Sequence, residues 1–181
     1  ELQKKERIFL SDLLAQNLRL MQGSLRDHEI DLIAQFEEVP PLECYPGQLS
    51  QVIVNLTQNA IEAMESRRSR SLTVAMKSCG CQTAVCEVDP LKKRSRARGC
   101  VVISFKDTGR GIAEDIKDRI FEPFFTTKGV LGGGNDSTPG TGLGLSIAYG
   151  IMKSHEGFIG CRSKAGAGGT SFCFVPALGR C

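Results

Sequence analysis

The chain has no long apolar run and only a small excess of positive charge. No segment approaches the roughly 20 consecutive apolar residues that a membrane span requires, and the charged start does not resemble a signal peptide. The formal net charge of +3 gives no indication of nucleic-acid binding. We therefore expect a cytoplasmic domain that contacts neither membrane nor nucleic acid. Residues 1–7 are expected to be a linker or a cut chain start, and the parent protein could itself be membrane-anchored.

Histidine is also scarce, since only His28 and His155 occur in 181 residues. No histidine lies near the four cysteines between residues 79 and 100, and their spacing is not the paired C-x-x-C of a zinc ribbon. We expect reduced thiols there, and a structural metal site is the alternative. The basic run over residues 92–98 is expected to be a solvated loop, with a binding patch as the alternative.

The length and composition fit one soluble domain with a proper core, because 41% of the residues are apolar and 24% charged. Strand and helix patterns are mixed without regular β-α-β alternation. This order predicts an α+β fold, a two-layer sandwich of a mixed β-sheet and α-helices. The predicted helices are 8–21, 48–65, 112–119 and 143–154; the predicted strands are 30–36, 71–77, 101–106, 158–163 and 170–176.

The helix predicted at 48–65 has an apolar stripe and, on another face, a polar row. Asn55, Asn59 and Glu62 fall at positions i, i+4 and i+7, so they share that face. Amide oxygens are hard ligands that Mg²⁺ accepts together with phosphate oxygens. The row is a candidate metal and phosphate site; the alternative is a helix face bonded to neighbouring backbone.

Asp107 ends an apolar strand, where a half-buried carboxylate needs hydrogen-bond donors. The exocyclic amine of adenine is a suitable donor. Gly109 and Gly111 follow, and glycines let the backbone approach a flat ligand closely. The alternative is a simple turn in which Asp107 caps the next helix.

Three glycines, Gly140, Gly142 and Gly144, lead directly into an apolar helix. Their exposed N–H groups and the positive helix end suit phosphates. No strand precedes them and no Lys-Ser or Lys-Thr pair follows, which excludes the Rossmann and Walker patterns. The alternative is a flexible linker.

Three phenylalanines surround Pro123 between residues 121 and 125. They are interpreted as core residues or as the anchor of a hinged lid. Thr126, Thr127 and Lys128 then supply hydroxyl groups and a cation near the expected phosphates.

Together and in this order, the segments resemble four boxes of the catalytic, ATP-binding domain of bacterial sensor histidine kinases, a branch of the GHKL superfamily. Residues 51–64 resemble the asparagine box, 107–111 the first glycine box, 121–128 the phenylalanine box and 140–145 the second glycine box. The likeness covers residues 8–176 and is nearest the nitrogen-regulation type.

The resemblance implies a Bergerat-type ATP-binding domain over residues 8–181. It places ATP between helices and lid, with the lid at about 126–141. The segment 78–100 is then a flexible insertion of unassigned role.

The resemblance also implies residue roles. Asn59 would bind Mg²⁺, with Asn55 beside it on metal or phosphate. Asp107 would bond the adenine amine directly and through a water shared with Thr170. The base would contact Gly109, Gly111 and Ile112, and the phosphates Thr126, Thr127, Lys128, Gly140, Gly142, Leu143, Gly144 and Leu145.

Two departures from the family pattern matter. Many sensor kinases carry a basic and an aromatic residue where this chain has Glu62 and Ala63. Stabilisation of the γ-phosphate therefore shifts to Lys128 or Arg110, and Lys128 and Asn55 are the candidate catalytic residues.

The second departure concerns the phosphate acceptor, a histidine on a separate two-helix domain of the family. Here His28 precedes a predicted strand, and His155 is expected to cap the end of a helix. The implied partners are a histidine-containing dimerisation domain of the parent kinase and, indirectly, a response regulator receiver domain. The isolated domain is expected to be monomeric.

Two other functions are alternatives for this chain, an ATP-driven ATPase and a scaffold. ATP-driven ATPases of the same superfamily need a glutamate four residues before the metal-binding asparagine, and this chain has Asn55 there. A scaffold without nucleotide binding is disfavoured by the retained Asn59 and Asp107.

Overall fold

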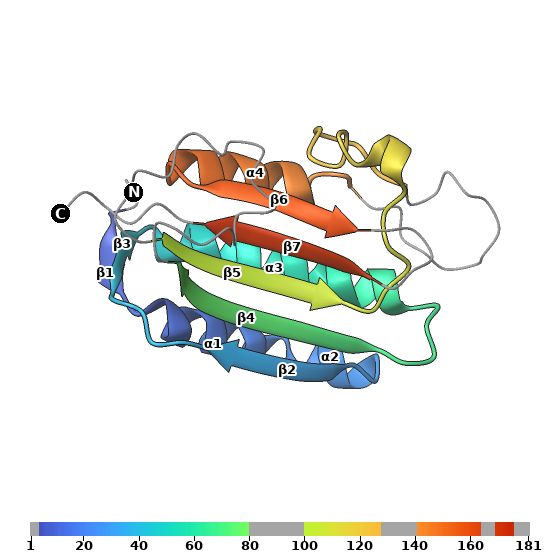
Figure 1. Ribbon diagram of the computed structural model, residues 1–181, viewed down its shortest axis with the longest axis horizontal. Helices are drawn as coiled ribbons and strands as arrows, with labels where there is room; N and C mark the ends of the chain where they lie inside the picture. Colours follow the sequence, from blue (N-terminus) through green and yellow to red (C-terminus); the bar gives the residue numbers. More distant parts are fainter. Residues whose placement is uncertain (1–3, 80–99, 128–140, 164–168, 176–181) are drawn as a thin grey trace.

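The fold is a five-stranded mixed sheet backed by helices (Figure 1). The computed structural model describes residues 4–79, 100–127, 141–163 and 169–175. The strand order is β2-β4-β5-β7-β6, in which only β2 and β4 pair in parallel. This confirms the predicted α+β sandwich. The strands are β2 (Asp31–Phe36), β4 (Ser71–Cys79), β5 (Cys100–Asp107), β6 (Phe158–Ser163) and β7 (Thr170–Val175).

Three helices, α1 (Leu10–Leu20), α3 (Pro46–Met64) and α4 (Gly144–Ser154), form the second layer. The apolar stripe of α3 is buried except for the half-buried Ala63 near its C-terminal end, as its periodicity predicts. It packs under β5, where Phe105 is 1% exposed. The described α3 begins two residues before the predicted start because Pro46 takes the first helical turn, where its missing N–H costs nothing.

The predicted helix at 112–119 is wrong, because only a 3₁₀ turn, η1 (Glu114–Ile116), forms there. Ile116 is the one large apolar side chain between residues 113 and 119, so a helix would have no stripe to bury. The segment instead crosses the end of the sheet as a loop.

Three short elements escaped the sequence patterns. They are α2 (Gln22–Asp27) and the antiparallel pair β1 (Glu6–Ile8) and β3 (Leu42–Cys44). Strands β1 and β3 have three residues each, and α2 has six, which is fewer than two helical turns, so none of them is long enough to show its period.

Strands β4 and β5 continue into the segment predicted as an insertion, since Cys79 pairs with Cys100. The rest of that segment, with the basic run and the inner cysteines, lies outside the described residues. Within the described ranges, no group of histidine, cysteine and acidic residues is arranged to hold a metal ion. Among the described helices, none is both long and apolar enough to cross a membrane.

Candidate functional site

Asp107 lies at the end of β5 and is only 3% exposed. Its Oδ1 accepts hydrogen bonds from the backbone N–H of Gly109, at 2.8 Å, and of Thr170, at 3.0 Å. Burial raises the pKa of this carboxyl, and the two N–H bonds partly oppose that rise. The capping alternative is not observed, because no described helix begins directly after Asp107. Both backbone N–H groups therefore donate to the same carboxyl oxygen, Oδ1.

The first glycine box rests on the C-terminal end of α3. A Cβ on Gly109 would lie 2.7 Å from the Ala63 Cβ, so no larger residue fits. The Arg110 N–H donates to the Ala63 carbonyl at 3.0 Å. This contact joins the asparagine-bearing helix to the loop that carries Asp107.

The two asparagines of α3 lie in different environments. Asn55 donates through Nδ2 to the Gly144 carbonyl at 2.9 Å and accepts at Oδ1 from Gln51 at 2.8 Å. For Asn59, Nδ2 is buried and has no hydrogen-bond partner among the described residues. The backbone-bonding alternative therefore holds for Asn55, whereas the Nδ2 of Asn59 is a buried donor without an acceptor among the described residues. Glu62, on the same face, accepts from Gln58 at 3.1 Å.

The second glycine box meets both the phenylalanine box and α3. A Cβ on Gly142 would lie 2.5 Å from the carbonyl carbon of Phe124, and one on Gly144 would lie 3.8 Å from Asn55. Helix α4 begins at Gly144 without a side-chain cap, so its first N–H groups keep their donor capacity. Leu145 packs against the core.

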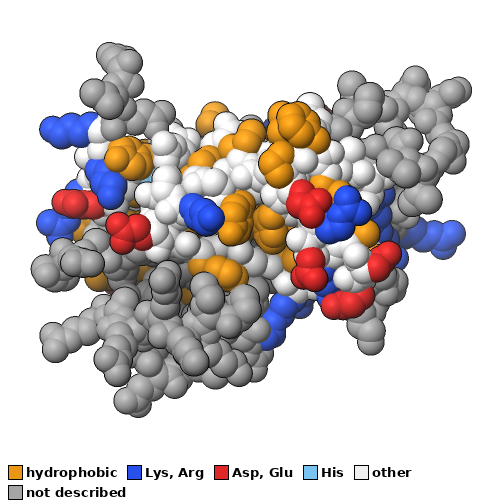
Figure 2. All heavy atoms as spheres, turned by 90° about the horizontal axis from the view of Figure 1, so that it is seen from above, with side chains coloured by type: hydrophobic (Ala, Val, Ile, Leu, Met, Phe, Trp, Pro, Cys, Tyr) orange, Lys and Arg blue, Asp and Glu red, His pale blue; other side chains and the backbone are white. Residues whose placement is uncertain are grey.

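The core interpretation holds for two of the three phenylalanines, and the lid-anchor interpretation stays a prediction. Phe121 and Phe125 pack against the core, whereas Phe124 is 74% exposed. Ile147 and Tyr149 of α4 are further exposed apolar residues, and on the face seen in Figure 2 apolar side chains lie between charged groups at both ends.

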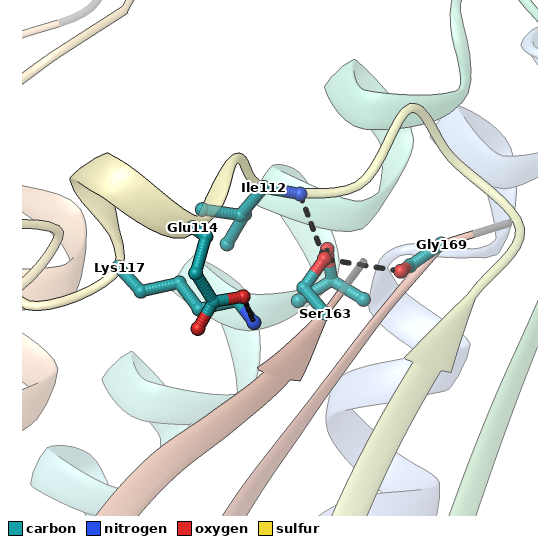
Figure 3. Close-up of polar contacts among 6 residues, drawn as sticks. Ile112, Glu114, Lys117, Ser163 and Gly169 are labelled. Atoms are coloured by element: carbon teal, nitrogen blue, oxygen red, sulfur yellow. Dashed lines mark hydrogen bonds and ion pairs between the residues drawn. The ribbon is translucent and has the colours of Figure 1, made fainter. Parts of the chain in front are cut away.

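Two residues that the sequence did not single out hold the first glycine box. Arg67 donates through Nη2 to the Gly109 carbonyl at 2.9 Å. Ser163, at the end of β6, accepts from the Ile112 N–H at 2.7 Å and donates to the Gly169 carbonyl at 3.1 Å (Figure 3). Neither carried a motif; a polar residue at a strand end is the only signal that Ser163 offers.

Two predicted site residues, Lys128 and Gly140, lie outside the described residues, together with most of the expected lid. Thr126 is half-buried and Thr127 is exposed at the end of the described segment. The other predicted residues lie on α3 (Asn55, Asn59), at or after the end of β5 (Asp107, Gly109, Gly111, Ile112), at or before the start of α4 (Gly142, Leu143, Gly144, Leu145) and at the start of β7 (Thr170). Hydrogen bonds join them in two groups, Asn55 with Gly144 and Asp107 with Gly109 and Thr170; that the two groups share one ligand stays a prediction.

The two histidines are both tied to backbone. His155 caps α4, as expected; it bonds the Ile151 carbonyl through Nδ1 at 2.9 Å and accepts from the Tyr45 N–H at Nε2 at 3.1 Å. His28 caps α2 and bonds the Ser24 carbonyl through Nδ1 at 2.8 Å.

Comparison with known proteins agrees with this geometry. The family model described as "Histidine kinase-, DNA gyrase B-, and HSP90-like ATPase" matches residues 44–180. Over 97% of this chain, 38% of residues are identical to the sensor kinase CckA of Brucella abortus. Over 92%, 32% are identical to the sensor histidine kinase ZraS of Escherichia coli. The chain spans 17% and 30% of these two relatives.

Two solved histidine kinase structures are similar to this chain in fold. The nucleotide-free catalytic domain of the histidine kinase ThkA superposes with a TM-score of 0.73 at 26% identity, covering 97% of this chain and 96% of that one. Full-length ShkA in complex with AMPPNP gives a TM-score of 0.75 at 23% identity, covering 98% of this chain and 32% of that one, which supports the fold alone. The nitrogen-regulation type stays a prediction.

Proposed function

The chain belongs to the histidine kinase-, DNA gyrase B- and HSP90-like ATPase family, and within it we propose that this domain binds Mg-ATP and donates the γ-phosphoryl group to a histidine of a separate dimerisation domain. The phosphoryl group would then pass to a response regulator receiver domain. The expectation that the isolated domain is a monomer belongs to the same proposal.

The observation that carries the proposal is the carboxylate of Asp107. A buried acid is costly unless donors surround it, and the backbone N–H groups of Gly109 and Thr170 both donate to Oδ1. The 6-amino group of adenine would supply a donor to the remaining oxygen. Gly109 and Gly111, the latter at φ +76°, give the flat base access to the loop.

The phosphates would lie between α3 and the start of α4. The uncapped N–H groups at Gly144 and Leu145 and the positive end of the helix suit an anion. Asn59 fits this site, because its Oδ1 is an oxygen ligand of the kind Mg²⁺ takes, and its buried Nδ2, which no described group accepts from, could donate to a phosphate oxygen. When bound, Mg²⁺ would neutralise phosphate charge.

Transfer then requires positioning rather than a base in this domain. A ring nitrogen of the acceptor histidine attacks the γ-phosphorus in line, the bond to the bridging oxygen breaks, and ADP leaves. Asn55 ties α3 to Gly144 and so fixes the helix that faces the phosphates. Lys128, or Arg110, would supply the cation at the γ-phosphate.

The acceptor is assigned to another domain, because His28 ends the six-residue helix α2 just before β2, and not on a long helix of the family's acceptor domain, and because His155 has no free ring nitrogen. His155 is 6% exposed and uses both ring nitrogens. An attacking imidazole needs a free ring nitrogen within reach of phosphorus, which His155 lacks.

The test is transfer of label from γ-labelled ATP to an added dimerisation domain. We expect label on the added domain that requires Mg²⁺, and none above background on this chain alone. His28→Gln serves as the control and should leave the transfer unchanged. Label on His28, or a lack of transfer despite measured ATP binding, would contradict the proposed reaction.

A further inference from the structure

We propose that Ser163 is a specificity-determining positioning residue, which fixes the Thr170 hydroxyl as a hydrogen-bond acceptor and so makes the pocket select 6-amino over 6-oxo purines. The inference rests on the proposed function, since it concerns the base of the bound triphosphate. Ser163 would act on the base through Thr170 and not by direct contact.

Ser163 joins three segments at the end of the sheet, as Figure 3 shows for its contacts with Ile112 and Gly169. Its Oγ lies 2.7 Å from the Ile112 nitrogen, 3.1 Å from the Gly169 oxygen and 2.9 Å from Thr170 Oγ1. Thr170 is 4% exposed and its own N–H bonds Asp107. The Ser163 hydroxyl therefore contacts the loop after β5 at Ile112, the backbone at Gly169, and the hydroxyl group of Thr170 beside Asp107.

A backbone N–H can only donate, so Ser163 accepts from Ile112. The single proton of Ser163 has two acceptors within reach, the Gly169 carbonyl at 3.1 Å and Thr170 Oγ1 at 2.9 Å. We assign it to Gly169, because a carbonyl can only accept whereas the Thr170 hydroxyl can donate, and the bond between the two hydroxyls then runs from Thr170 to Ser163. Thr170 spends its proton in that bond, and its oxygen can only accept from any further group.

This leaves acceptor oxygens from two side chains in the base-binding region, the Asp107 carboxyl group and Thr170 Oγ1. A 6-amino purine offers donors to them, directly or through a water, and a 6-oxo purine offers only an acceptor at the same position. Mismatched buried polar groups are a strong source of discrimination. Without the Ser163 hydroxyl, Thr170 can rotate and donate, so the penalty against the 6-oxo group falls.

The experiment is calorimetric titration of the full 181-residue chain with Mg-ATP and Mg-ITP, which differ in the 6-substituent and in the proton that the 6-oxo purine carries on N1. For Ser163→Ala we expect ATP to bind about tenfold more weakly and ITP to be unaffected or tighter, so the preference for ATP falls about tenfold. Ser163→Thr retains a hydroxyl and should keep the wild-type preference. Ser154→Ala is the matched control, because Ser154 is an exposed serine at the end of α4.

An equal loss for both nucleotides, or an unchanged preference, would overturn the inference and reduce Ser163 to a structural role. Ser163→Cys is measured in parallel, because its weakly donating thiol should give an intermediate preference even if the alanine variant does not fold. A wild-type chain that binds neither triphosphate contradicts the proposed function itself, and this inference falls with it. A wild-type chain that binds both equally contradicts the inference while leaving triphosphate binding in place.

Discussion

Gly142 lies against the backbone of Phe124, so that the two ends of the expected lid meet. An ideal Cβ on Gly142 would come within 2.5 Å of the Phe124 carbonyl carbon. Both residues have positive φ, +66° at Gly142 and +64° at Phe124. A non-glycine residue in that region costs energy and persists only where its surroundings enforce it. The contact therefore fixes where the intervening segment leaves and re-enters the domain.

Gly142→Ala should destabilise the domain and weaken triphosphate binding. The added methyl group meets backbone that cannot move aside, and alanine at positive φ costs about 1–2 kcal/mol before any clash. Thermal unfolding and ATP titration measure the two effects. Gly150→Ala is the matched control, since Gly150 has open space around it in α4; it should raise stability by about 0.5–1 kcal/mol. Equal behaviour of the two variants would contradict the contact.

Asp107→Asn should separate folding from adenine binding. The asparagine Oδ1 can still accept from Gly109 and Thr170, but its Nδ2 places a donor where adenine also donates. We expect ATP affinity to fall by about tenfold or more while the fold persists. A variant that binds ATP as tightly as the wild type would contradict the assignment of the acid.

The same variant should change the pH dependence of stability. Burial raises the pKa of Asp107 above its ordinary value of 3.8, so the folded state favours the protonated form. Its contribution to stability is therefore complete below that value and is lost as pH rises through the raised pKa. Asp107→Asn removes this loss, and the unfolding free energy at neutral pH should be equal or higher. A clearly lower value would show that the ionised carboxylate stabilises the fold.

Asn59→Ala should change the Mg²⁺ dependence of nucleotide binding, whereas Asn55→Ala should change the stability of the fold. Asn59 has a buried amide without a described partner, so its loss should change stability little and remove the Mg²⁺ dependence of nucleotide binding. Asn55 bonds Gln51 and Gly144, and its loss should cost about 1 kcal/mol. Titrations with Mg²⁺ and with chelator, beside thermal unfolding, distinguish the two. Unchanged Mg²⁺ dependence in Asn59→Ala would contradict the metal assignment.

Cys44 should resist alkylation in the folded chain. It is fully buried, and burial, followed by the nearby charge of Glu6, raises the pKa of its thiol to about 11. Only the thiolate reacts. Peptide mapping after treatment at pH 8 should find Cys44 unlabelled unless the chain is first denatured. Stability from this thiol is complete below its ordinary pKa of 9.0 and is lost as pH rises through about 11, so Cys44→Ala should flatten that alkaline decline.

The sequence predicted the long elements because each buries a regular stripe. Helix α3 and strands β4 and β5 are clear cases, with boundaries within a few residues of the structure. The predicted helix at 112–119 failed because local composition was read without a buried face to support it. The short strands β1 and β3 form only by pairing with each other, and no local sequence pattern can reveal that pairing.

The candidate site could be predicted as a set of residues but not as a set of contacts. Sequence spacing placed Asn55 and Asn59 on one face, yet it could not show that Gly144 occupies the first and leaves the second unsatisfied. The supporting roles of Arg67 and Ser163 depend on loops that meet only in three dimensions.

The central claim is that the described groups converge on one adenine nucleotide. Calorimetric titration of the unmodified chain with ATP and GTP, each with Mg²⁺ and with chelator, tests it most directly. The account predicts one saturable ATP site per chain, weaker binding with chelator, and GTP binding at least about tenfold weaker. Absence of ATP binding, or equal affinity for the two nucleotides, would contradict it.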